Sequence, residues 1–586
     1  MKFSTQIRTL LCLATGLTFA STALGQAGLF NNRGAVVYIN TGAVVRVLGT
    51  VTNSKINADM TNMGDFYIDN NFVNDSVAGG DGIYHVWGDW INNRRFNAGS
   101  GEVSLEGADQ LITGDSLTWF YDLTCLGSGV KTQTLNSKVS HRLNLNDREL
   151  ATDQFDMTVT TANTAAVTRT TGFVSSLSNG KLYRNVNVNN AYIFPTGSSV
   201  GLTRYRPVEI TPTTTEAGLY GVRLVNNDAT PDGYDRSLLD TIVCRVNDKY
   251  YHRINRPTGT VPATVSVFYD ATQDQETWDI LAHWTVSPNK WLGMDPTTAS
   301  TQGGLEVLTR ANWNTFTEEP YILGLRRPEL PTITGPNLLC GNTSGNTYII
   351  DPSMPGATYN WSITGGAITG GTPSSDITVS WGNSGSGVVG ASVTAPNGCT
   401  SGIATYPVSL YIAPTAIYTT DTNNVFAFDL ISFTDNSIDG AVEWDWDFGD
   451  GVQTTEQNPF HMYDVPGQYN VCLMVTSNEG CMDTTCSVIE IVEGLVVPNV
   501  FTPNGDGVND VFHIKNSGMD EYSVQIFNRW GLLIFETTAP QIKWDGTTNS
   551  GEQVPSGVYY FILKAKSATQ EYEKAGTVTV LYNSSN

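Results

Sequence analysis

Short runs of β-branched and aromatic residues, separated by turn-forming Asn, Asp and Gly, recur from Gly34 to about Gly180. Such runs predict β-strands, because branched and aromatic side chains pack well on a pleated surface. Each run is too short to bury much apolar surface alone, which favours stacking of successive turns of chain into a parallel β-helix. An ordinary β-sandwich fits the same pattern. The irregular spacing leaves both architectures open for a head domain over residues 26–190.

The composition is typical of a folded β-protein with several domains. The chain has 586 residues, too many for one hydrophobic core, and 57 of them are Gly, which suits tight turns. Hydrophobic residues make up 40% and charged residues only 15%, whereas disordered chains are charge-rich. We therefore predict an all-β fold, in which a β-helix-like or β-sandwich head is followed by tandem immunoglobulin-like β-sandwiches.

The net charge of −24 limits the class of partner. It argues against nucleic acid, whose phosphates must be neutralised by Lys and Arg, and against docking on anionic lipid headgroups. We therefore expect no nucleic-acid partner.

The first 25 residues have the pattern of a secretory signal peptide. Lys2 and Arg8 give a positively charged start, and an apolar run follows over residues 10–20. The small residues Ala23 and Gly25 form a cleavage site. The run is too short to span a membrane and no later run qualifies, so we expect no transmembrane segment in the mature chain. The product is expected to be secreted or held at the outer-membrane cell surface.

Seven of the eight cysteines remain after removal of residues 1–25, in a setting that permits disulfides. Cys340 and Cys399 flank the strands of one immunoglobulin-sized segment, and a bond between them would close a loop of about 60 residues. Cys472 and Cys486 lie on the two strands of a predicted hairpin, where they would face each other across the ladder. The other cysteines give, by default, one pair and one odd thiol: Cys125 with Cys244, and Cys481.

Changes in strand length and in proline content divide the rest of the chain. Longer alternating segments after residue 190 predict a separate β-sandwich over 191–330. The Pro-rich stretch 326–331 then reads as a stiff linker.

The segment 331–414 has the size and alternation of an immunoglobulin-like sandwich. It carries Gly335-Pro336, Tyr359-Asn360-Trp361, Gly365-Gly366 and Asn397-Gly398-Cys399. On these residues it resembles the PKD-like immunoglobulin modules of secreted bacterial proteins.

Three motifs follow in residues 415–493. They are Trp446-Asp447-Phe448-Gly449-Asp450-Gly451, then residues 458–463 (NPFHMY), then residues 466–471 (PGQYNV). In this order they resemble a PKD domain, which implies a seven-stranded β-sandwich. Within the first motif, Trp446 and Phe448 alternate onto the core side of a strand.

The last segment, 494–586, contains four more motifs. They are residues 496–510 (VVPNVFTPNGDGVND), 527–531 (FNRWG), 544–546 (WDG) and 555–560 (PSGVYY). Together they resemble the gliding motility-associated C-terminal domain, the type B sorting domain of the type IX secretion system. The resemblance implies that residues 494–586 engage the outer-membrane secretion machinery. Such recognition uses a folded surface and requires no catalytic group.

One loop of this segment is a candidate cation site. Asn504, Asp506, Asn509 and Asp510 place four oxygen-bearing side chains in seven residues, and Ca²⁺ takes six to eight oxygen ligands. The loop departs from an EF-hand, because Val508 occupies a ligand position and no Glu closes it. Asx-turns explain the same residues without a metal. No cofactor is required, and Ca²⁺ is the one candidate.

No hydrolase constellation stands out in the sequence. It contains no His-Glu-x-x-His, no Gly-x-Ser-x-Gly and no P-loop. The region 30–325 is nevertheless rich in carboxylates, and glycosidases need only two. At predicted turns these side chains are explained by turn formation. The carboxylates are Asp65, Asp69, Asp75, Asp81 and Asp89.

The aromatic run Tyr84, Trp87 and Trp90 hints at sugar stacking, but rings spaced by three cannot all share one strand face. We expect a non-enzymatic, adhesin-like surface protein whose head contacts an extracellular glycan or matrix. The alternatives are a secreted polysaccharide-active enzyme with its site in residues 30–325, and a structural subunit of an extracellular assembly.

Overall fold

The computed structural model describes residues 28–383, 385–421, 425–517, 519–539, 541–567 and 571–582, so the signal peptide expected at residues 1–25 lies outside it. Within these ranges the fold is almost entirely β, which confirms the all-β prediction. Helical structure is limited there to α1 (Ala271–Asp274) and to 3-10 turns at Thr164–Ala166 and Thr230–Asp232. The chain forms two compact units: Met1–Glu329 with Thr394–Ser401, and Leu330–Val393 with Gly402–Asn586.

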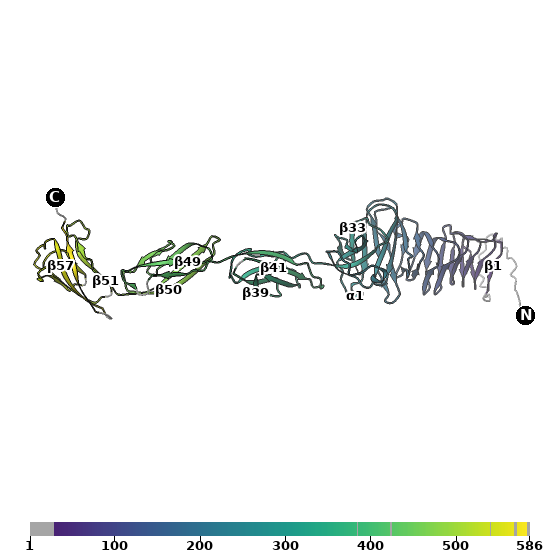
Figure 1. Ribbon diagram of the computed structural model, residues 1–586. Coiled ribbons are helices and arrows are strands. Elements are labelled where there is room, and N and C mark those ends of the chain that lie inside the picture. The colour runs from purple at the N-terminus through teal and green to yellow at the C-terminus, as the bar shows by residue number, and fades with distance from the viewer. Residues whose placement is uncertain are drawn as a thin grey trace. The chain divides into compact units, whose positions relative to one another are not determined.

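The first unit begins with a parallel β-solenoid, so the head has the solenoid rather than the sandwich architecture. Each of the first four turns of chain places one short strand in each of three stacks, visible as successive coils in Figure 1. The first stack is an eight-stranded sheet: β1 (Phe30–Asn32), β4 (Val51–Asn53), β7 (Phe72–Asn74), β10 (Trp90–Asn92), β13 (Gln110–Thr113), β15 (Val130–Gln133), β17 (Glu149–Ala151) and β20 (Phe173–Ser175).

The other two stacks complete the coil. The second has four strands: β2 (Val36–Ile39), β5 (Asp59–Asn62), β8 (Val77–Gly79) and β11 (Arg95–Asn97). The third contributes eight strands to a larger sheet: β3 (Val44–Val47), β6 (Asp65–Ile68), β9 (Ile83–Val86), β12 (Glu102–Leu105), β14 (Thr118–Cys125), β16 (Ser137–Asn144), β18 (Met157–Val159) and β21 (Leu182–Val186); β19 (Val167–Thr168) pairs with β16 beside them.

A ladder of buried asparagines runs through the first stack. Asn32, Asn53, Asn74 and Asn92 occupy matching positions in neighbouring strands and are at most 4% exposed. Each Nδ2 donates to the Oδ1 of the next asparagine, at 2.8, 3.0 and 2.8 Å. Buried amides require such partners, so the ladder holds successive turns of chain in register. Because it is buried, it offers no binding surface.

The third stack continues without a break into the next region. β21 pairs antiparallel with β26, and one hydrophobic cluster includes residues of the solenoid and of both following sheets. The domains expected over 26–190 and 191–330 are therefore joined, because the last solenoid strand is also a strand of the sandwich. The added strands of the 15-stranded sheet are β26 (Gly218–Val225), β28 (Tyr251–Thr258), β34 (Pro320–Arg326), β30 (Ile280–Val286), β31 (Asn289–Gly293) and β27 (Val243–Val246).

The remaining strands of the first unit form two smaller sheets. Five strands make the other layer of the sandwich: β22 (Tyr192–Phe194), β25 (Val208–Pro212), β29 (Ala263–Tyr269), β33 (Leu305–Trp313) and β32 (Thr298–Gln302). Two more pair by themselves: β23 (Gly197–Ser198) and β24 (Arg204–Tyr205).

The second unit contains three successive β-sandwiches, each with its own hydrophobic cluster. One sheet of the first sandwich consists of β35 (Ile333–Thr334), β37 (Asn346–Ile350), β40 (Asp376–Trp381) and β39 (Gly366–Gly370). Its other sheet consists of β36 (Leu338–Cys340), β42 (Ala404–Tyr411), β41 (Gly385–Thr394) and β38 (Thr358–Thr364). One sheet of the second sandwich consists of β43 (Tyr418–Thr420), β45 (Leu430–Asp435) and β48 (Phe460–Met462). Its other sheet consists of β44 (Val425–Phe426), β50 (Met482–Val492), β49 (Gly467–Ser477), β46 (Ala441–Asp447) and β47 (Gln453–Thr454).

The third sandwich closes the chain. One of its sheets consists of β51 (Gly494–Val496), β53 (Phe512–Ser517) and β56 (Ile542–Trp544). The other consists of β52 (Val500–Phe501), β58 (Glu571–Val580), β57 (Gly557–Lys566), β54 (Glu521–Phe527) and β55 (Leu533–Thr537).

In the second sandwich, Trp446 and Phe448 are buried at 0% and 1% exposure, so both side chains point into the core, as their alternation predicted.

The disulfides correct part of the expected pairing. Cys472 and Cys486 lie opposite each other on β49 and β50 and are bonded, the pair that the hairpin spacing indicated. The expected Cys340–Cys399 bond is wrong. Cys399 lies on a turn, residues 394–401, that packs with the first unit, and it is bonded there to Cys244.

Cys340 is bonded instead to Cys481, which was expected to be the odd thiol. Among the described residues the free cysteine is Cys125, which was expected to pair with Cys244. Cys125 is buried in the solenoid core, and burial raises the pKa of its thiol to about 12. Because this thiol is buried, it does not support an intermolecular disulfide.

Candidate functional site

The outward side chains of the solenoid strands β3, β6, β9, β12, β14 and β16 form one open surface, which we call the sheet face. Inward residues of these strands, such as Phe66, Tyr84 and Val86, are buried, so the alternate positions point away from the core. Arg46, Tyr67 and His85 occupy matching positions across β3, β6 and β9, and therefore form a row.

A histidine held between rings and carboxylates lies in this row. The His85 and Tyr67 rings are stacked with their centroids 4.2 Å apart and an angle of 3° between the planes. His85 Nδ1 lies 2.5 Å from Glu106 Oε1, which also accepts a hydrogen bond from Ser104 Oγ at 3.0 Å. His85 Nε2 is 4.0 Å from Asp65 Oδ1 on the other side. The arrangement fixes the imidazole and leaves a ring surface and carboxylate oxygens on the outside.

The same combination recurs farther along the sheet. The His141 ring stacks on Tyr121 at 4.6 Å and 17°, and His141 Nδ1 lies 2.6 Å from Asp122 Oδ1. Trp119, on the same strand as Tyr121, is 48% exposed, and the Lys138 ammonium lies 4.6 Å from its ring centre. The sheet face thus carries two Tyr–His–carboxylate groups. Trp87 lies near the first group, and the half-exposed Trp119 lies on the strand that carries Tyr121 of the second.

Trp87 is the tryptophan beside the first group. Its ring lies 6.2 Å from that of Tyr67 and 5.6 Å from the Arg46 guanidinium, which is paired with Asp69 at 3.0 Å. Tyr84 and Trp90, by contrast, are 1% and 0% exposed and pack against each other in the core. Of the three aromatic residues singled out in the sequence, the structure brings only Trp87 to the surface.

The carboxylates singled out in the sequence divide in the same way. Asp81 and Asp89 accept backbone N–H groups of Ser100 and Leu111 on the following turn of chain. Asp75 accepts a hydrogen bond from the Asn93 side chain. These three support turns, whereas Asp65 and Asp69 belong to the sheet face. The signal that sequence reasoning missed is the stacking of a tyrosine on a histidine of the neighbouring strand, Tyr67 with His85 and Tyr121 with His141, which becomes visible only through the strand pairing.

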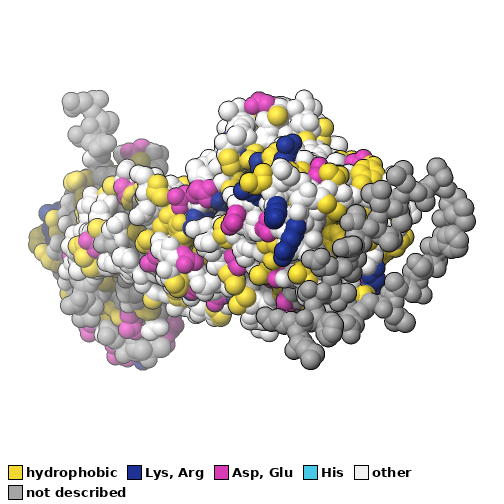
Figure 2. All heavy atoms as spheres, turned by 90° about the vertical axis from the view of Figure 1, so that its right-hand side faces the viewer, with side chains coloured by type: hydrophobic (Ala, Val, Ile, Leu, Met, Phe, Trp, Pro, Cys, Tyr) yellow, Lys and Arg dark blue, Asp and Glu magenta, His cyan; other side chains and the backbone are white. Residues whose placement is uncertain are grey.

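The sheet face carries charged groups among its rings, including Arg46, Asp65, Glu106, Asp122 and Lys138. Viewed from the N-terminal end of the solenoid, most of the described surface consists of uncharged side chains with scattered hydrophobic ones (Figure 2). No group of three or more His, Cys, Asp or Glu in the described ranges is arranged to hold a metal ion.

The loop that holds the candidate calcium ligands is closed by its own hydrogen bonds. The Asp510 carboxylate accepts the backbone N–H groups of Asn504, Gly505 and Gly507, at 3.0, 2.6 and 2.7 Å. These hydrogen bonds lower the pKa of Asp510. Asn504 Oδ1 and Asp506 Oδ1 likewise accept N–H groups two residues on, as Asx-turns do. Calcium binding by Asn504, Asp506, Asn509 and Asp510 stays a prediction.

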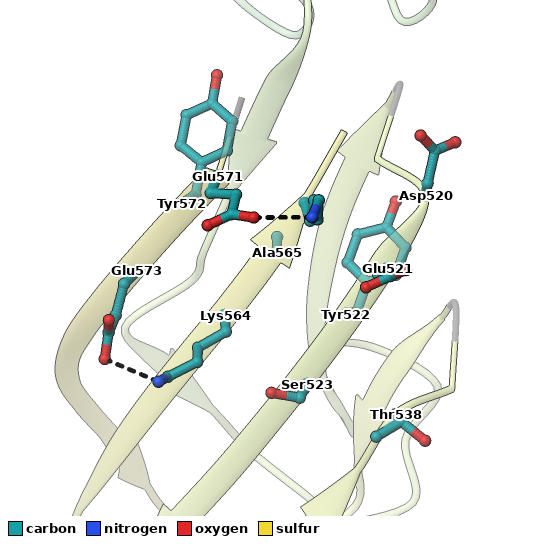
Figure 3. A pocket seen from close by; sticks show the side chains of 11 residues that line it. Asp520, Glu521, Tyr522, Ser523, Thr538, Lys564, Ala565, Glu571, Tyr572 and Glu573 are labelled. Carbon is teal, nitrogen blue, oxygen red and sulfur yellow. Dashed lines mark ion pairs between the residues drawn. The ribbon is translucent and has the colours of Figure 1, made fainter. Parts of the chain in front are cut away.

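The same domain has a surface hollow of about 850 Å³ at one end of β54, β57 and β58. Two ion pairs border it, Lys566 with Glu571 at 2.8 Å and Lys564 with Glu573 at 3.4 Å (Figure 3). All four side chains are more than half exposed, so the pairs add little stability.

Three segments of the chain match family models. Residues 495–580 match the CHU_C type IX secretion signal domain, residues 411–492 a PKD domain and residues 327–409 a PKD-like domain. These matches confirm the resemblances drawn from the motifs. A type IX secretion signal implies the secretion machinery as a partner, and export to the cell surface or the medium. Among the described residues, no helix is long and apolar enough to cross a membrane.

Relatives share only short segments with the chain. Collagenase ColA of Clostridium perfringens is 39% identical over 71 residues, 12% of this chain and 6% of the relative. Microbial collagenase of Vibrio alginolyticus is 34% identical over 82 residues, 14% of this chain and 10% of the relative. The chain thus spans a tenth or less of these relatives. A solved PKD1 domain of the Vibrio cholerae metalloprotease PrtV is 31% identical, covering 14% of this chain and 99% of that domain, with a TM-score of 0.13.

Proposed function

We propose that this exported protein is a non-enzymatic, adhesin-like surface protein whose solenoid head binds an extracellular glycan on the sheet face. The observation that carries the proposal is the pair of Tyr–His–carboxylate groups, with Trp87 and Trp119 beside them, on an open surface.

The chemistry of this surface suits a sugar chain. A pyranose ring has a face of C–H groups, which packs on an aromatic ring, and a rim of hydroxyl groups, which donate and accept hydrogen bonds. Tyr67 and Trp87 offer ring surface, and Glu106 and Asp65 offer acceptors next to it. Neighbouring strands of a parallel sheet lie about 4.8 Å apart, so the row repeats at a spacing that an extended chain can follow.

The domains that follow the head support presentation at a surface. The two PKD-type sandwiches connect the head to the type IX secretion signal domain along the chain. Related PKD segments also occur in collagenases, so these domains by themselves do not decide between a binding protein and an enzyme.

The competing proposal is a polysaccharide-active enzyme with its site in residues 30–325. Asp65 and Glu106 on either side of His85 are the carboxylates that favour it, because glycosidases use two. The open surface around them favours binding, since enzymes usually enclose the reacting bond and exclude water.

The test uses the full mature chain, a glycan array and an assay for released reducing ends and unsaturated sugars. Trp87→Ala and Trp119→Ala should each weaken glycan binding at least about fivefold, on the scale of ~1–3 kcal/mol for a stacked ring. Trp530→Ala in the C-terminal domain is the matched control, because Trp530 is 85% exposed and lies outside the head. Turnover that is lost in Asp65→Asn or Glu106→Gln would establish the enzyme instead.

A further inference from the structure

A second polar site lies in the first unit and shares no residue with the sheet face. It is a cavity of about 390 Å³, within the ~300–1,000 Å³ typical of small-molecule sites. Its lining comes from the paired strands β26 and β28 and from the turns after β20 and β23. The cavity therefore forms where the last turns of the solenoid run into the sandwich.

Two arginines line this cavity side by side. Arg223 and Arg253 lie directly opposite each other across β26 and β28, and like charges in that position repel. Burial, and secondarily the positive charge of Arg253, lower the pKa of Arg223. Such a pair is unexpected in a chain that has 56 acidic and only 32 basic residues.

The present partners of both arginines are mostly neutral oxygens. Arg223 donates to the Ser178 carbonyl and, at 3.4 Å, to the Asn179 side chain, and Arg253 donates to the Glu318 carbonyl. Each guanidinium has five N–H donors, so several donors remain. Within the described part of the chain, neither arginine forms an ion pair.

The one carboxylate in the lining is that of Asp232, whose negative charge acts on Arg223 less strongly than the positive charge of Arg253 does. Asp232 Oδ2 accepts a hydrogen bond from the Tyr251 hydroxyl at 2.7 Å. The other polar lining residues are uncharged and carry hydroxyl or amide groups, which both donate and accept hydrogen bonds. They are Ser176, Ser178, Ser198, Asn179, Asn226 and Asn227.

We propose that this cavity binds the carboxylate-bearing unit of an acidic saccharide. The carboxylate lies between Arg223 and Arg253, because a guanidinium binds a planar carboxylate through two parallel N–H···O bonds. The hydroxyl groups of the sugar face the serine and asparagine side chains of the lining. The inference concerns a different site from the sheet face and does not depend on the function proposed for it.

Calorimetric titration of the full mature chain tests this, with trigalacturonate as the probe and galactotriose as its uncharged counterpart. We expect trigalacturonate to bind, and galactotriose to bind at least tenfold more weakly at this cavity. Arg223→Gln and Arg253→Gln should each weaken trigalacturonate binding at least tenfold. Arg245→Gln is the matched control, because Arg245 is 52% exposed and paired with Glu276 outside the cavity.

Asn227→Asp keeps the result interpretable if either arginine variant fails to fold. Asn227 is exposed at the cavity, and the added carboxylate should repel the ligand and weaken its binding at least tenfold without removing an arginine contact. No binding of trigalacturonate, or binding that Asn227→Asp leaves unchanged, overturns the inference. Binding lost in Trp87→Ala but not in the cavity variants would overturn it too, while supporting the sheet face.

Discussion

Cys340 is bonded to Cys481, with their Cα atoms 5.6 Å apart and a sequence separation of 141 residues. The bond joins the first sandwich of the second unit to the second one, whereas Cys472–Cys486 closes a single hairpin over a separation of 14 residues. A cross-link over a longer loop removes more entropy from the unfolded chain.

We expect the double variant Cys340→Ser/Cys481→Ser to leave both sandwiches folded, because each has its own hydrophobic cluster. Chain entropy predicts a loss of up to about 5 kcal/mol in the free energy of unfolding, against about 3 kcal/mol for Cys472→Ser/Cys486→Ser. Guanidinium unfolding followed by circular dichroism measures both. An unchanged midpoint for the first variant would contradict the role of the bond.

Proteolysis between residues 411 and 417 checks the same bond independently. A cut there should leave the two sandwiches joined on a non-reducing gel and release them on a reducing one. Separation without reductant would show that Cys340 and Cys481 are not bonded.

The asparagine ladder should be a main support of the solenoid. Asn74→Ala removes the acceptor of Asn53 and the donor to Asn92, and leaves buried polar groups without partners. Each such group costs about 1–3 kcal/mol, so a loss of several kcal/mol in unfolding free energy is expected. Urea denaturation of the mature chain measures it. Asn97→Ala, at an exposed position of β11, is the control and should change the midpoint little.

Two buried histidines predict the pH dependence of the first unit. Burial lowers the pKa of His252 and of His283 from 6.5 to about 4. Between these values the unfolded chain binds the proton more readily than the folded one, so stability is full above about pH 6.5 and falls as the pH drops toward 4. The expected loss is on the order of 3 kcal/mol per histidine.

His283→Phe isolates this effect, because the ring lies among Trp313 and Tyr321 and its Nε2 has no hydrogen-bond partner within the described residues. The melting temperature of the variant should depend less on pH between 4 and 6.5 than that of the parent chain. Parallel curves for the two proteins would show that His283 is protonated equally in both states.

The Asn504–Asp510 loop should depend on the Asp510 carboxylate. Because Asp510 accepts three backbone N–H groups, Asp510→Ala should open the loop and lower the melting temperature of the chain's C-terminal sandwich. Calcium should have little effect if these bonds suffice. A melting temperature that rises with calcium, and no longer does so in Asp506→Asn, would instead establish the cation site.

Local sequence decided the features that depend on neighbours in the chain. The alternation of Trp446 and Phe448 predicted their burial, and the spacing of Cys472 and Cys486 about a hairpin predicted their pairing. The PKD and secretion-signal motifs lie within single domains, so they could be recognised before any contact was known. Strand periodicity also indicated that Tyr84, Trp87 and Trp90 could not share one face.

Tertiary structure alone decided which distant segments meet. Cys399 pairs with Cys244 rather than Cys340, because its turn packs with the first unit, and no local pattern encodes that contact. Tyr67 and His85 become neighbours only through the register of β6 and β9, since short strands of irregular spacing do not specify how turns of the coil align. Arg223 and Arg253 meet for the same reason, as partners across strands 30 residues apart in the numbering. The sequence determined strands, turns and domain families, whereas the binding surfaces arise from long-range pairing, whose energy is shared among many distant residues.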